Sequence, residues 1–170
     1  MIISSLFDLS PKVLFDKLKK IVKAQRKLSR EIVVVVGVGF VGAVMAAVVA
    51  DSRNKKGEPQ KFVIGMQRPS TRSFWKIPLL NRGVSPVKSE DPEVDELIER
   101  CVNRDKTLIA TYTYEVLKLA DVVVVDVQCD YLKESFGDSL NGSANMAALE
   151  ASLEDISENI EPDTLVLIET

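Results

Sequence analysis

The sequence of 170 residues contains no histidine and only two cysteines, Cys101 and Cys129. Without histidine the chain has no Ser-His-Asp triad and none of the common histidine-containing zinc sites. The two cysteines make neither a metal-ligand spacing nor a disulfide framework, so we expect no metal site here. Their scarcity favours a reduced, cytoplasmic setting.

Long apolar runs and a secretion signal are also missing. No apolar run reaches the roughly 18–20 residues that a membrane span needs. The start at Met1–Leu6 has neither the basic n-region nor the long apolar h-region of a signal peptide. The hydrophobic content of 46% is nevertheless enough for a core and argues against disorder. This length corresponds to one ordinary domain or to a large part of a bigger fold.

Charge is unevenly distributed along the chain. Residues 1–30 carry eight Lys/Arg and two Asp, a net charge of +6, whereas the whole chain has −3 and the remainder therefore −9. Ser10-Pro11 is a typical helix start, and apolar residues follow at helical spacing. The pattern predicts a basic amphipathic helix over Pro11–Lys27, within an extension of residues 1–30. Its lysines either contact nucleic acid or a membrane, or form a solvated face, which we favour.

Apolar runs alternate with helical patterns from residue 31 to residue 170. Nearly unbroken valine and isoleucine runs are typical of strands buried on both faces of a parallel sheet. The expected strands are Ile32–Val36, Lys61–Met66, Thr107–Thr111, Asp121–Val127 and Thr164–Ile168, and the expected helices are Phe40–Ala50, a short one near Phe74–Leu80, Pro92–Asn103, Tyr112–Leu119 and Ala144–Asn159, with a polar loop at Tyr131–Ser143. The alternation predicts an α/β fold with a doubly wound parallel sheet.

The strongest local signal is a glycine turn, Gly37-Val38-Gly39-Phe40-Val41-Gly42, between the first expected strand and the helix that follows it. In this context G-x-G-x-x-G predicts dinucleotide binding by a Rossmann-like domain at residues 31–170. Gly37 permits the tight turn, Gly39 lets a pyrophosphate approach the backbone, and Gly42 lets the helix lie close to the strand. The N–H groups at the helix start, near Phe40 and Val41, then face the phosphates. A turn that serves packing alone is the alternative.

The residue that usually holds the adenosine ribose is not acidic in this chain. A carboxylate is expected at the end of the second strand, but the strand ends Met66-Gln67-Arg68. Gln67 can hydrogen-bond a ribose hydroxyl. Arg68, with Ser70 and Thr71 nearby, can meet a 2′-phosphate, which would favour NADP over NAD. A solvated arginine at a strand end explains Arg68 equally well.

Other candidate ligand contacts follow the later strands. Val127 and Gln128 come after the fourth strand, where ligands of open α/β sheets bind, so Gln128 is expected near the nicotinamide ribose. Cys129 is interpreted as a packing residue rather than a nucleophile, and Cys101 as part of the core. Two aromatic questions stay open. Tyr112 and Tyr114 are either ligand contacts or helix packing, and Trp75 either covers the adenine or caps the core.

Several segments together resemble a known family. They are Val34–Gly42, Ile64-Gly65, Leu80-Asn81-Arg82-Gly83-Val84-Ser85-Pro86, Asp91–Ile98, Ala120–Val125 and Leu165–Thr170. Over residues 31–170 the chain is similar to the N-terminal domain of the UDP-glucose/GDP-mannose dehydrogenase family, nearest to its UDP-N-acetylmannosamine dehydrogenase-like members. The N-R-G-x-S-P segment and the I-E-T ending make the resemblance more specific than the glycine turn alone.

The resemblance implies an activity and a set of cofactor contacts. The family oxidises the C6 hydroxyl of a nucleotide sugar to a carboxylate in two NAD-dependent steps through a covalent cysteine adduct, in polysaccharide biosynthesis. The implied contacts are Gly37, Gly39, Phe40, Val41 and Gly42 at the pyrophosphate, Gln67 and Arg68 at the adenosine ribose, Val127 and Gln128 at the nicotinamide ribose, and Thr170 in the I-E-T ending.

The chain departs from the family in sequence and in length. Gln67 replaces the usual ribose acid, and Val127-Gln128-Cys129-Asp130 replaces the usual V-P-T-P. The family continues after I-E-T with a dimerising helix, a catalytic Lys and Asn, and a nucleophilic Cys in a Gly-rich loop, none of which lies within these residues. We therefore expect no catalytic residue here, dinucleotide binding without turnover, and UDP-sugar binding only with a further domain. A homo-oligomer is possible.

Two other functions compete with a nucleotide-sugar dehydrogenase domain. One is a non-catalytic dinucleotide-binding or regulatory module that uses the basic helix as its partner contact. The other is a different two-domain dehydrogenase, of the hydroxyacid or 6-phosphogluconate type, and the N-R-G-x-S-P segment argues against it.

Overall fold

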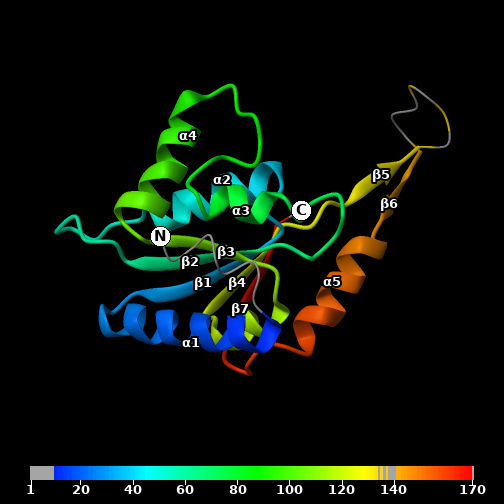
Figure 1. Ribbon diagram of the computed structural model, residues 1–170. Coiled ribbons are helices and arrows are strands. Elements are labelled where there is room, and N and C mark those ends of the chain that lie inside the picture. Colours follow the sequence, from blue (N-terminus) through cyan, green and yellow to red (C-terminus); the bar gives the residue numbers. More distant parts are fainter. Residues whose placement is uncertain (1–9, 134, 136, 138–140, 170) are drawn as a thin grey trace.

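The computed structural model describes residues 10–169 except 134, 136 and 138–140, and its centre is a five-stranded parallel sheet (Figure 1). The strand order is β3-β2-β1-β4-β7. The bounds are β1 Glu31–Val36, β2 Lys61–Met66, β3 Leu108–Thr111, β4 Val122–Val125 and β7 Leu165–Ile168. All strand pairs in this sheet are parallel, which confirms the predicted doubly wound α/β fold.

Helices cover both faces of the sheet. The helical bounds are α1 Pro11–Lys27, α2 Phe40–Ala50, α3 Lys76–Leu80, α4 Pro92–Glu99, the π-helix η1 Arg100–Arg104, the 3-10 helix η2 Tyr114–Leu119 and α5 Ala147–Ser157. Helices α2, α3 and α4 lie on one face with a core that includes Val33 and Val35. Helices α1, α5 and η2 lie on the other with a core that includes Val34 and Val36. The valine run of β1 is thus buried on both sides, as parallel strands are.

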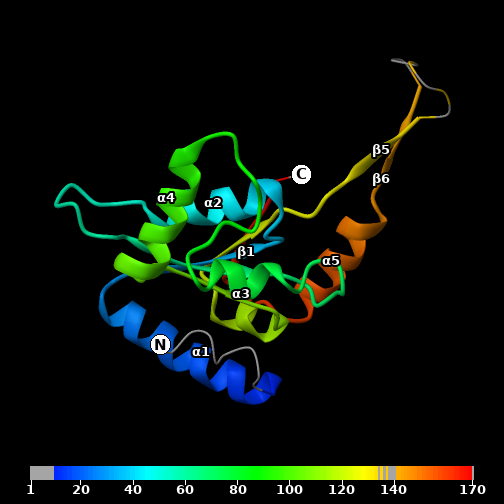
Figure 2. The same cartoon turned by 45° about the horizontal axis from the view of Figure 1, so that its top comes forward.

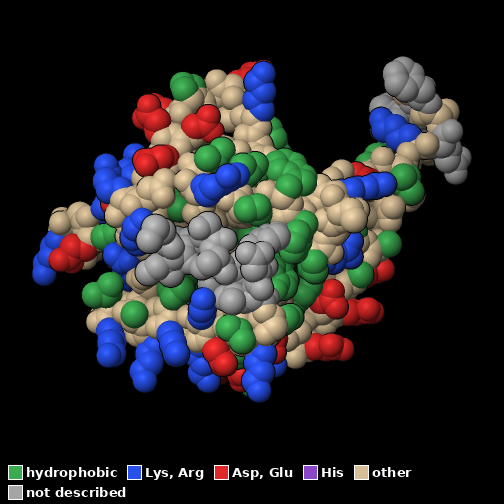
Figure 3. Space-filling view, viewed as in Figure 1, with side chains coloured by type: hydrophobic (Ala, Val, Ile, Leu, Met, Phe, Trp, Pro, Cys, Tyr) green, Lys and Arg blue, Asp and Glu red, His purple; other side chains and the backbone are tan. Residues whose placement is uncertain are grey.

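Helix α1 packs on the sheet through its apolar side. Leu14, Leu18 and Val22 are buried in the same core as β1. Arg26 anchors the end of the helix by donating to the carbonyl oxygen of Leu119 at 3.0 Å and to Asp121 at 2.8 Å. The opposite side carries a row of lysine and arginine side chains, visible along the lower edge of Figure 3. The amphipathic pattern in the sequence thus separates core contacts from a solvated basic face.

Leu18→Ala is therefore expected to destabilise the whole domain. Leu18 is fully buried between α1 and the sheet, and removing its side chain should cost about 3 kcal/mol, which corresponds to roughly 8 °C in Tm. Thermal unfolding followed by circular dichroism measures the effect. Lys19→Ala is the matched control on the exposed side of the same helix, and it should change the stability by less than about 0.5 kcal/mol. An equal loss in both variants would contradict the packing role of α1.

The N-R-G segment after α3 has a structural role at the edge of the sheet. The buried side chain of Asn81 accepts from the Ala110 N–H at 2.7 Å and donates to the Ala110 carbonyl at 2.9 Å. It thereby substitutes for a neighbouring strand beside the edge strand β3. Gly83 has a φ of +77°, which a side chain rarely adopts. Asn81 and Gly83 of this segment are thus explained by folding requirements.

One expected loop proved to be a projecting arm. The structure forms an antiparallel pair from β5 (Asp130–Leu132) and β6 (Ser143–Asn145), at the two ends of the region expected as a polar loop at Tyr131–Ser143. Helix α5 consequently begins at Ala147 rather than Ala144. The arm extends away from the body in both Figure 1 and Figure 2, and all six strand residues are exposed. The prediction failed because strands without a buried face lack the apolar alternation that identifies a strand.

Other expected elements are shorter than the sequence pattern indicated. Strand β4 ends at Val125 instead of Val127, and the carbonyl group of the next residue, Asp126, lies close to Gly37 of the glycine turn. The segment expected as a helix over Tyr112–Leu119 is the 3-10 helix from Tyr114. The helix expected to reach Asn103 changes to π geometry after Glu99. Among the described residues, no helix is both long enough and apolar enough to cross a membrane.

Candidate functional site

A pocket of about 690 Å³ lies at the carboxyl ends of the strands, beside the glycine turn. It straddles β1 and β4, where the strand order reverses and where open α/β sheets bind their ligands. Its lining comprises Val36, Gly37, Gly39, Phe40, Val41, Gln67, Arg68, Lys76, Tyr114, Asp126, Val127, Gln128, Cys129, Ala148, Ser152 and Glu169. A second pocket, of about 800 Å³, lies between residues 83–88 and α4 and contains none of the predicted contacts.

The structure brings most of the predicted contact residues together. Residues from the glycine turn, from the end of β2 and from the end of β4 all line the same pocket. Gly42 is not part of the lining and lies behind the turn, against Gly37 and Asp126. Thr170 lies outside the described residues.

The three glycines of the turn have different surroundings. Gly37 has a φ of +99°, and a Cβ there would overlap the carbonyl oxygen of Asp126. A Cβ at Gly42 would overlap the Gly37 carbonyl and the Asp126 carboxylate. Around Gly39, by contrast, a Cβ would meet nothing within 4 Å. Gly37 and Gly42 are therefore needed by the fold, whereas Gly39 leaves open space in the pocket.

The amino-terminal end of α2 faces this pocket. Gly39 is the N-cap and offers no side chain to the first-turn N–H groups. Phe40 and Val41 line the pocket and are 67% and 49% exposed, although they begin an otherwise well-packed helix. The Gly42 N–H of this first turn donates to the Asp126 carboxylate. The N–H groups of Phe40 and Val41 precede it, and a helix amino terminus attracts anions through such groups and through its dipole.

Gln67 connects the end of β2 to the glycine turn. Its Oε1 accepts the Val38 N–H at 3.0 Å, and its Nε2 donates to Ser73 Oγ at 3.3 Å. The backbone N–H can only donate, so the oxygen must face Val38 and the amide orientation follows. Gln67 thus holds the turn in place and retains one N–H for a ligand.

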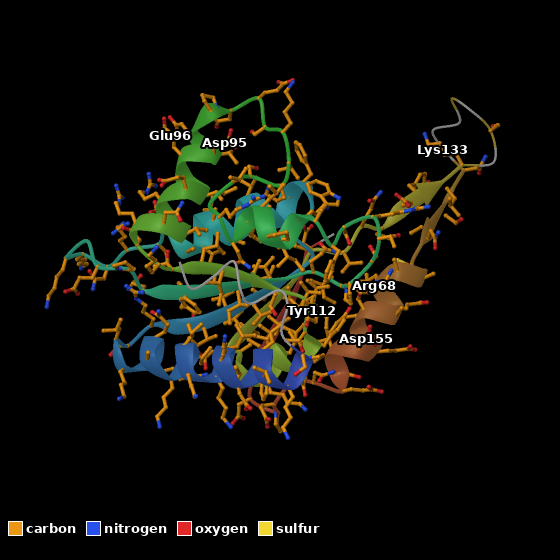
Figure 4. The ribbon with its side chains drawn as sticks, viewed as in Figure 1. Arg68, Asp95, Glu96, Tyr112, Lys133 and Asp155 are labelled. Carbon is orange, nitrogen blue, oxygen red and sulfur yellow. The ribbon has the colours of Figure 1, made fainter. Side chains whose placement is uncertain are left out.

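Two basic side chains line the pocket near Gln67. Arg68 follows β2, and Lys76 begins α3. Figure 4 shows Arg68 on the side of the sheet toward α5. Among the ion pairs found between described residues, neither Arg68 nor Lys76 takes part. Both charges are therefore available to an anion in the pocket.

The segment after β4 forms the opposite wall. Gln128 Nε2 donates to Asp130 Oδ1 at 2.6 Å. Cys129 Sγ lies 3.5 Å from the carbonyl oxygen of Asn145 and 3.4 Å from the sulfur of Met146. The wall thus continues directly into the β5–β6 arm. Cys101, by contrast, is fully buried, as expected of a core residue. Burial raises the pKa of its thiol.

The aromatic residues that the sequence left open have separate positions. Tyr114 lines the pocket, and burial, with Asp155 nearby, raises the pKa of its phenol. Tyr112 packs against Phe74 with ring centroids 5.6 Å apart. Trp75 is 49% exposed, donates to the Arg72 carbonyl at 2.9 Å and does not line this pocket.

Sequence reasoning missed several pocket residues, of which Asp126 is the most informative. Lys76, Ala148, Ser152 and Glu169 also line the pocket. Burial raises the pKa of Asp126 above 3.8 and the nearby Glu169 adds to this, while the Gly42 N–H and Lys76 oppose it. The available signal was a carboxylate directly after a run of four valines. No group of three or more metal-ligating side chains occurs in the described part of the chain.

Comparison with solved structures identifies proteins with a similar fold. The NDP-N-acetyl-D-galactosaminuronic acid dehydrogenase of Methanosarcina mazei Go1 is 29% identical, with a TM-score of 0.68 over 90% of this chain and 30% of that chain. The UDP-D-ManNAc dehydrogenase of Pyrococcus horikoshii is 26% identical, with a TM-score of 0.61 over 81% of this chain and 28% of its own. This chain resembles the nucleotide-sugar dehydrogenases. The similarity is to their N-terminal domain region.

The resemblance has a defined extent. GDP-mannose dehydrogenase of Pseudomonas aeruginosa shares the fold at 24% identity, with a TM-score of 0.59 over 80% of this chain and 27% of that chain. The present chain therefore spans about 30% of the length of the nucleotide-sugar dehydrogenases that it matches. No family model and no curated protein matches the sequence.

Proposed function

We propose that this chain binds NAD as the cofactor-binding domain of a nucleotide-sugar 6-dehydrogenase, an enzyme that oxidises the C6 hydroxyl of a UDP-sugar to a uronic acid. The observation that carries the proposal is the open space at Gly39, the N-cap residue at the amino terminus of α2, which has no side chain. A pyrophosphate needs both a close backbone approach and free N–H donors, and this position offers the two together. The similarity to nucleotide-sugar dehydrogenases supports the choice of reaction.

Each predicted contact has a proposed role in this complex. The pyrophosphate lies against Gly37, Gly39 and Gly42 and the first turn of α2 at Phe40 and Val41. Gln67, through its remaining N–H, and Arg68 hold the adenosine ribose. Val127 and Gln128 approach the nicotinamide ribose, and Thr170 belongs to the same set. The bound nicotinamide supplies hydride acceptance, while these residues bind and orient the cofactor.

We also propose that these residues alone do not oxidise a nucleotide sugar. Cys101 is buried in the core, and Cys129 packs against Met146 and Asn145 at the pocket wall. Hydride transfer requires cofactor and substrate to be held together, and the UDP-sugar is expected to bind only with a further domain. Absorbance at 340 nm with NAD and UDP-N-acetylmannosamine or UDP-glucose tests this, and measurable NADH formation would contradict it.

Direct titration tests the binding proposal. Purified protein is titrated with NAD and, separately, with NADP in an isothermal calorimeter, with AMP as a ligand that lacks the pyrophosphate bridge. Saturable binding of a dinucleotide at one site per chain supports the proposal, and no binding of either dinucleotide refutes it. Light scattering of the same samples reports whether the chain forms a homo-oligomer.

NADP is the second candidate cofactor, because Arg68 and Lys76 both line the pocket and take part in none of the ion pairs found between the described residues. If a 2′-phosphate binds Arg68, then Arg68→Ala should weaken NADP binding by about tenfold or more and change NAD binding by less than threefold. Calorimetric Kd values for both cofactors measure the difference. Arg72→Ala is the control at a nearby exposed arginine outside the pocket lining. A preference for NAD that Arg68→Ala leaves unchanged would rule out the NADP assignment.

A non-catalytic dinucleotide-binding or regulatory module remains the alternative function. The exposed basic side of α1 favours it, because a row of lysines without core contacts is a suitable surface for an acidic partner. The reading frame that follows Thr170 in the gene distinguishes the two functions. A continuing frame with a cysteine in a Gly-rich loop supports the dehydrogenase domain.

A further inference from the structure

Two acidic residues, Asp126 and Glu169, follow neighbouring strands at the end of the sheet that borders the pocket. Strands β4 and β7 pair with Val125 opposite Ile168, and the Glu169 N–H donates to the Val125 carbonyl at 2.9 Å. The next residues, Asp126 and Glu169, therefore leave neighbouring strands together. Both line the pocket that contains the glycine turn.

The Asp126 carboxylate lies against the first turn of α2. It accepts a hydrogen bond from the Gly42 N–H, one of the groups that the helix itself cannot satisfy. Its Oδ2 atom is so close to Gly42 that a Cβ there would overlap it. Asp126 thus holds the helix start to β4, and it places a negative charge beside the proposed pyrophosphate position.

The groups that face Asp126 come from several elements. Glu169 approaches from the end of β7, Lys76 from α3, and the Gly42 N–H from α2. Arg68 after β2, Tyr114 of η2 and Cys129 after β4 also line the pocket. Burial and Glu169 disfavour the ionised carboxylate, and Lys76 and the Gly42 N–H favour it, with a net rise in the pKa of Asp126. An added anion in the pocket shifts this balance further toward the protonated acid.

We propose that Asp126 is a positioning residue that takes up a proton from solvent when a dinucleotide pyrophosphate binds at the glycine turn. The inference rests on the proposed function. Protonation removes the repulsion between carboxylate and pyrophosphate, and the acid's carbonyl oxygen can still accept the Gly42 N–H while its O–H donates to a phosphate oxygen. The proton is bound at Asp126 in the complex and returns to solvent when the cofactor leaves.

The direction in which NAD affinity changes with pH follows from the pKa of Asp126 in the free protein and in the complex. The pKa of Asp126 is raised in the free protein and rises further beside bound pyrophosphate. Between these two values the complex holds a proton that the free protein does not, so affinity falls as pH rises. Because the chain has no histidine, none of its side chains has an ordinary pKa between pH 5 and 8. A change of affinity in this range therefore indicates a group whose pKa is shifted. NADP is unsuitable as the probe because its 2′-phosphate titrates in this range.

Calorimetric titration with NAD between pH 4.5 and 8.0, in pairs of buffers with unlike ionisation heats, tests the proposal. The wild-type protein should lose affinity by about threefold or more over this range, with net proton uptake. Asp126→Asn keeps an oxygen acceptor for Gly42 but cannot take up the proton, so its affinity should not depend on pH and should exceed that of the wild type at pH 8.0. Glu169→Gln should displace the fall in affinity to lower pH.

The controls separate this inference from the proposed function. Glu96→Gln removes a carboxylate from the exposed surface of α4, well away from Arg68 and the pocket (Figure 4), and should retain the wild-type pH profile. Thermal unfolding confirms that the variants are folded. NAD binding that is independent of pH in the wild type, or that remains pH-dependent in Asp126→Asn, overturns the role of Asp126 alone. Absence of NAD binding at every pH instead refutes the proposed function.

Discussion

Gly39→Ala should weaken NAD binding by about 30-fold or more while leaving the fold unchanged. The backbone at Gly39 has φ −78° and ψ −154°, which an alanine adopts without a left-handed conformation. An added Cβ meets no protein atom within 4 Å. The methyl group therefore occupies the space proposed for the pyrophosphate. Displacing the phosphates from the α2 N–H groups should cost about 2 kcal/mol of binding free energy.

The measurement combines a binding assay with a stability assay on the same protein. Calorimetry gives the Kd for NAD, and chemical denaturation gives the free energy of unfolding. Gly57→Ala is the matched control, because Gly57 lies in a distant surface turn with no protein atom within 4 Å of an added Cβ; it should bind NAD normally. Unchanged NAD affinity in Gly39→Ala would place the pyrophosphate elsewhere.

Gly37→Ala should destabilise the whole domain by about 4 kcal/mol or more. Gly37 combines a φ of +99° with an added Cβ that would overlap the Asp126 carbonyl oxygen. The left-handed conformation alone costs an alanine roughly 1–2 kcal/mol. Moving β4 away from the turn to relieve the overlap should cost several kcal/mol more, because the β1–β4 pair lies in the centre of the sheet.

Gly57→Ala again provides the comparison. It shares a positive φ, +78°, but an added Cβ there lies in open space, so it should lose only the conformational cost of about 1–2 kcal/mol. The difference in unfolding free energy between Gly37→Ala and Gly57→Ala then measures the overlap with β4. Similar losses in the two variants would show that the turn can relax, and that its close packing against Asp126 contributes little to stability.

The elements with a buried apolar pattern could be predicted to within a few residues. The bounds of α1, α2 and β2 agree with the sequence prediction, because each is a distinct amphipathic or apolar segment that is bounded by a capping or turn signal. The arm of β5 and β6 could not be predicted, because its exposed residues carry no such pattern. Secondary structure could therefore be predicted from the sequence where the element has a buried apolar face.

The candidate site divides in the same way. The glycine turn could be predicted because its residues are contiguous in the sequence. The structure adds the residues that line the pocket beside it, which include Gln67, Arg68, Val127 and Gln128. The role of Gln67 in holding the turn could not be predicted, because its side-chain oxygen accepts the N–H of Val38, 29 positions away in the sequence. Asp126 was also missed, because its significance depends on Gly42 and Glu169, which approach from other elements.

The sequence by itself determined the alternation of strands and helices, the parallel sheet and the position of the glycine turn. These features follow from local conformational preference and from periodic burial, which neighbouring residues specify among themselves. Only the tertiary structure decided that α1 packs on the sheet, that Gln67 holds the turn, and that Asp126 meets Gly42. Such contacts join distant residues, so they depend on strand order and register, which no local pattern contains.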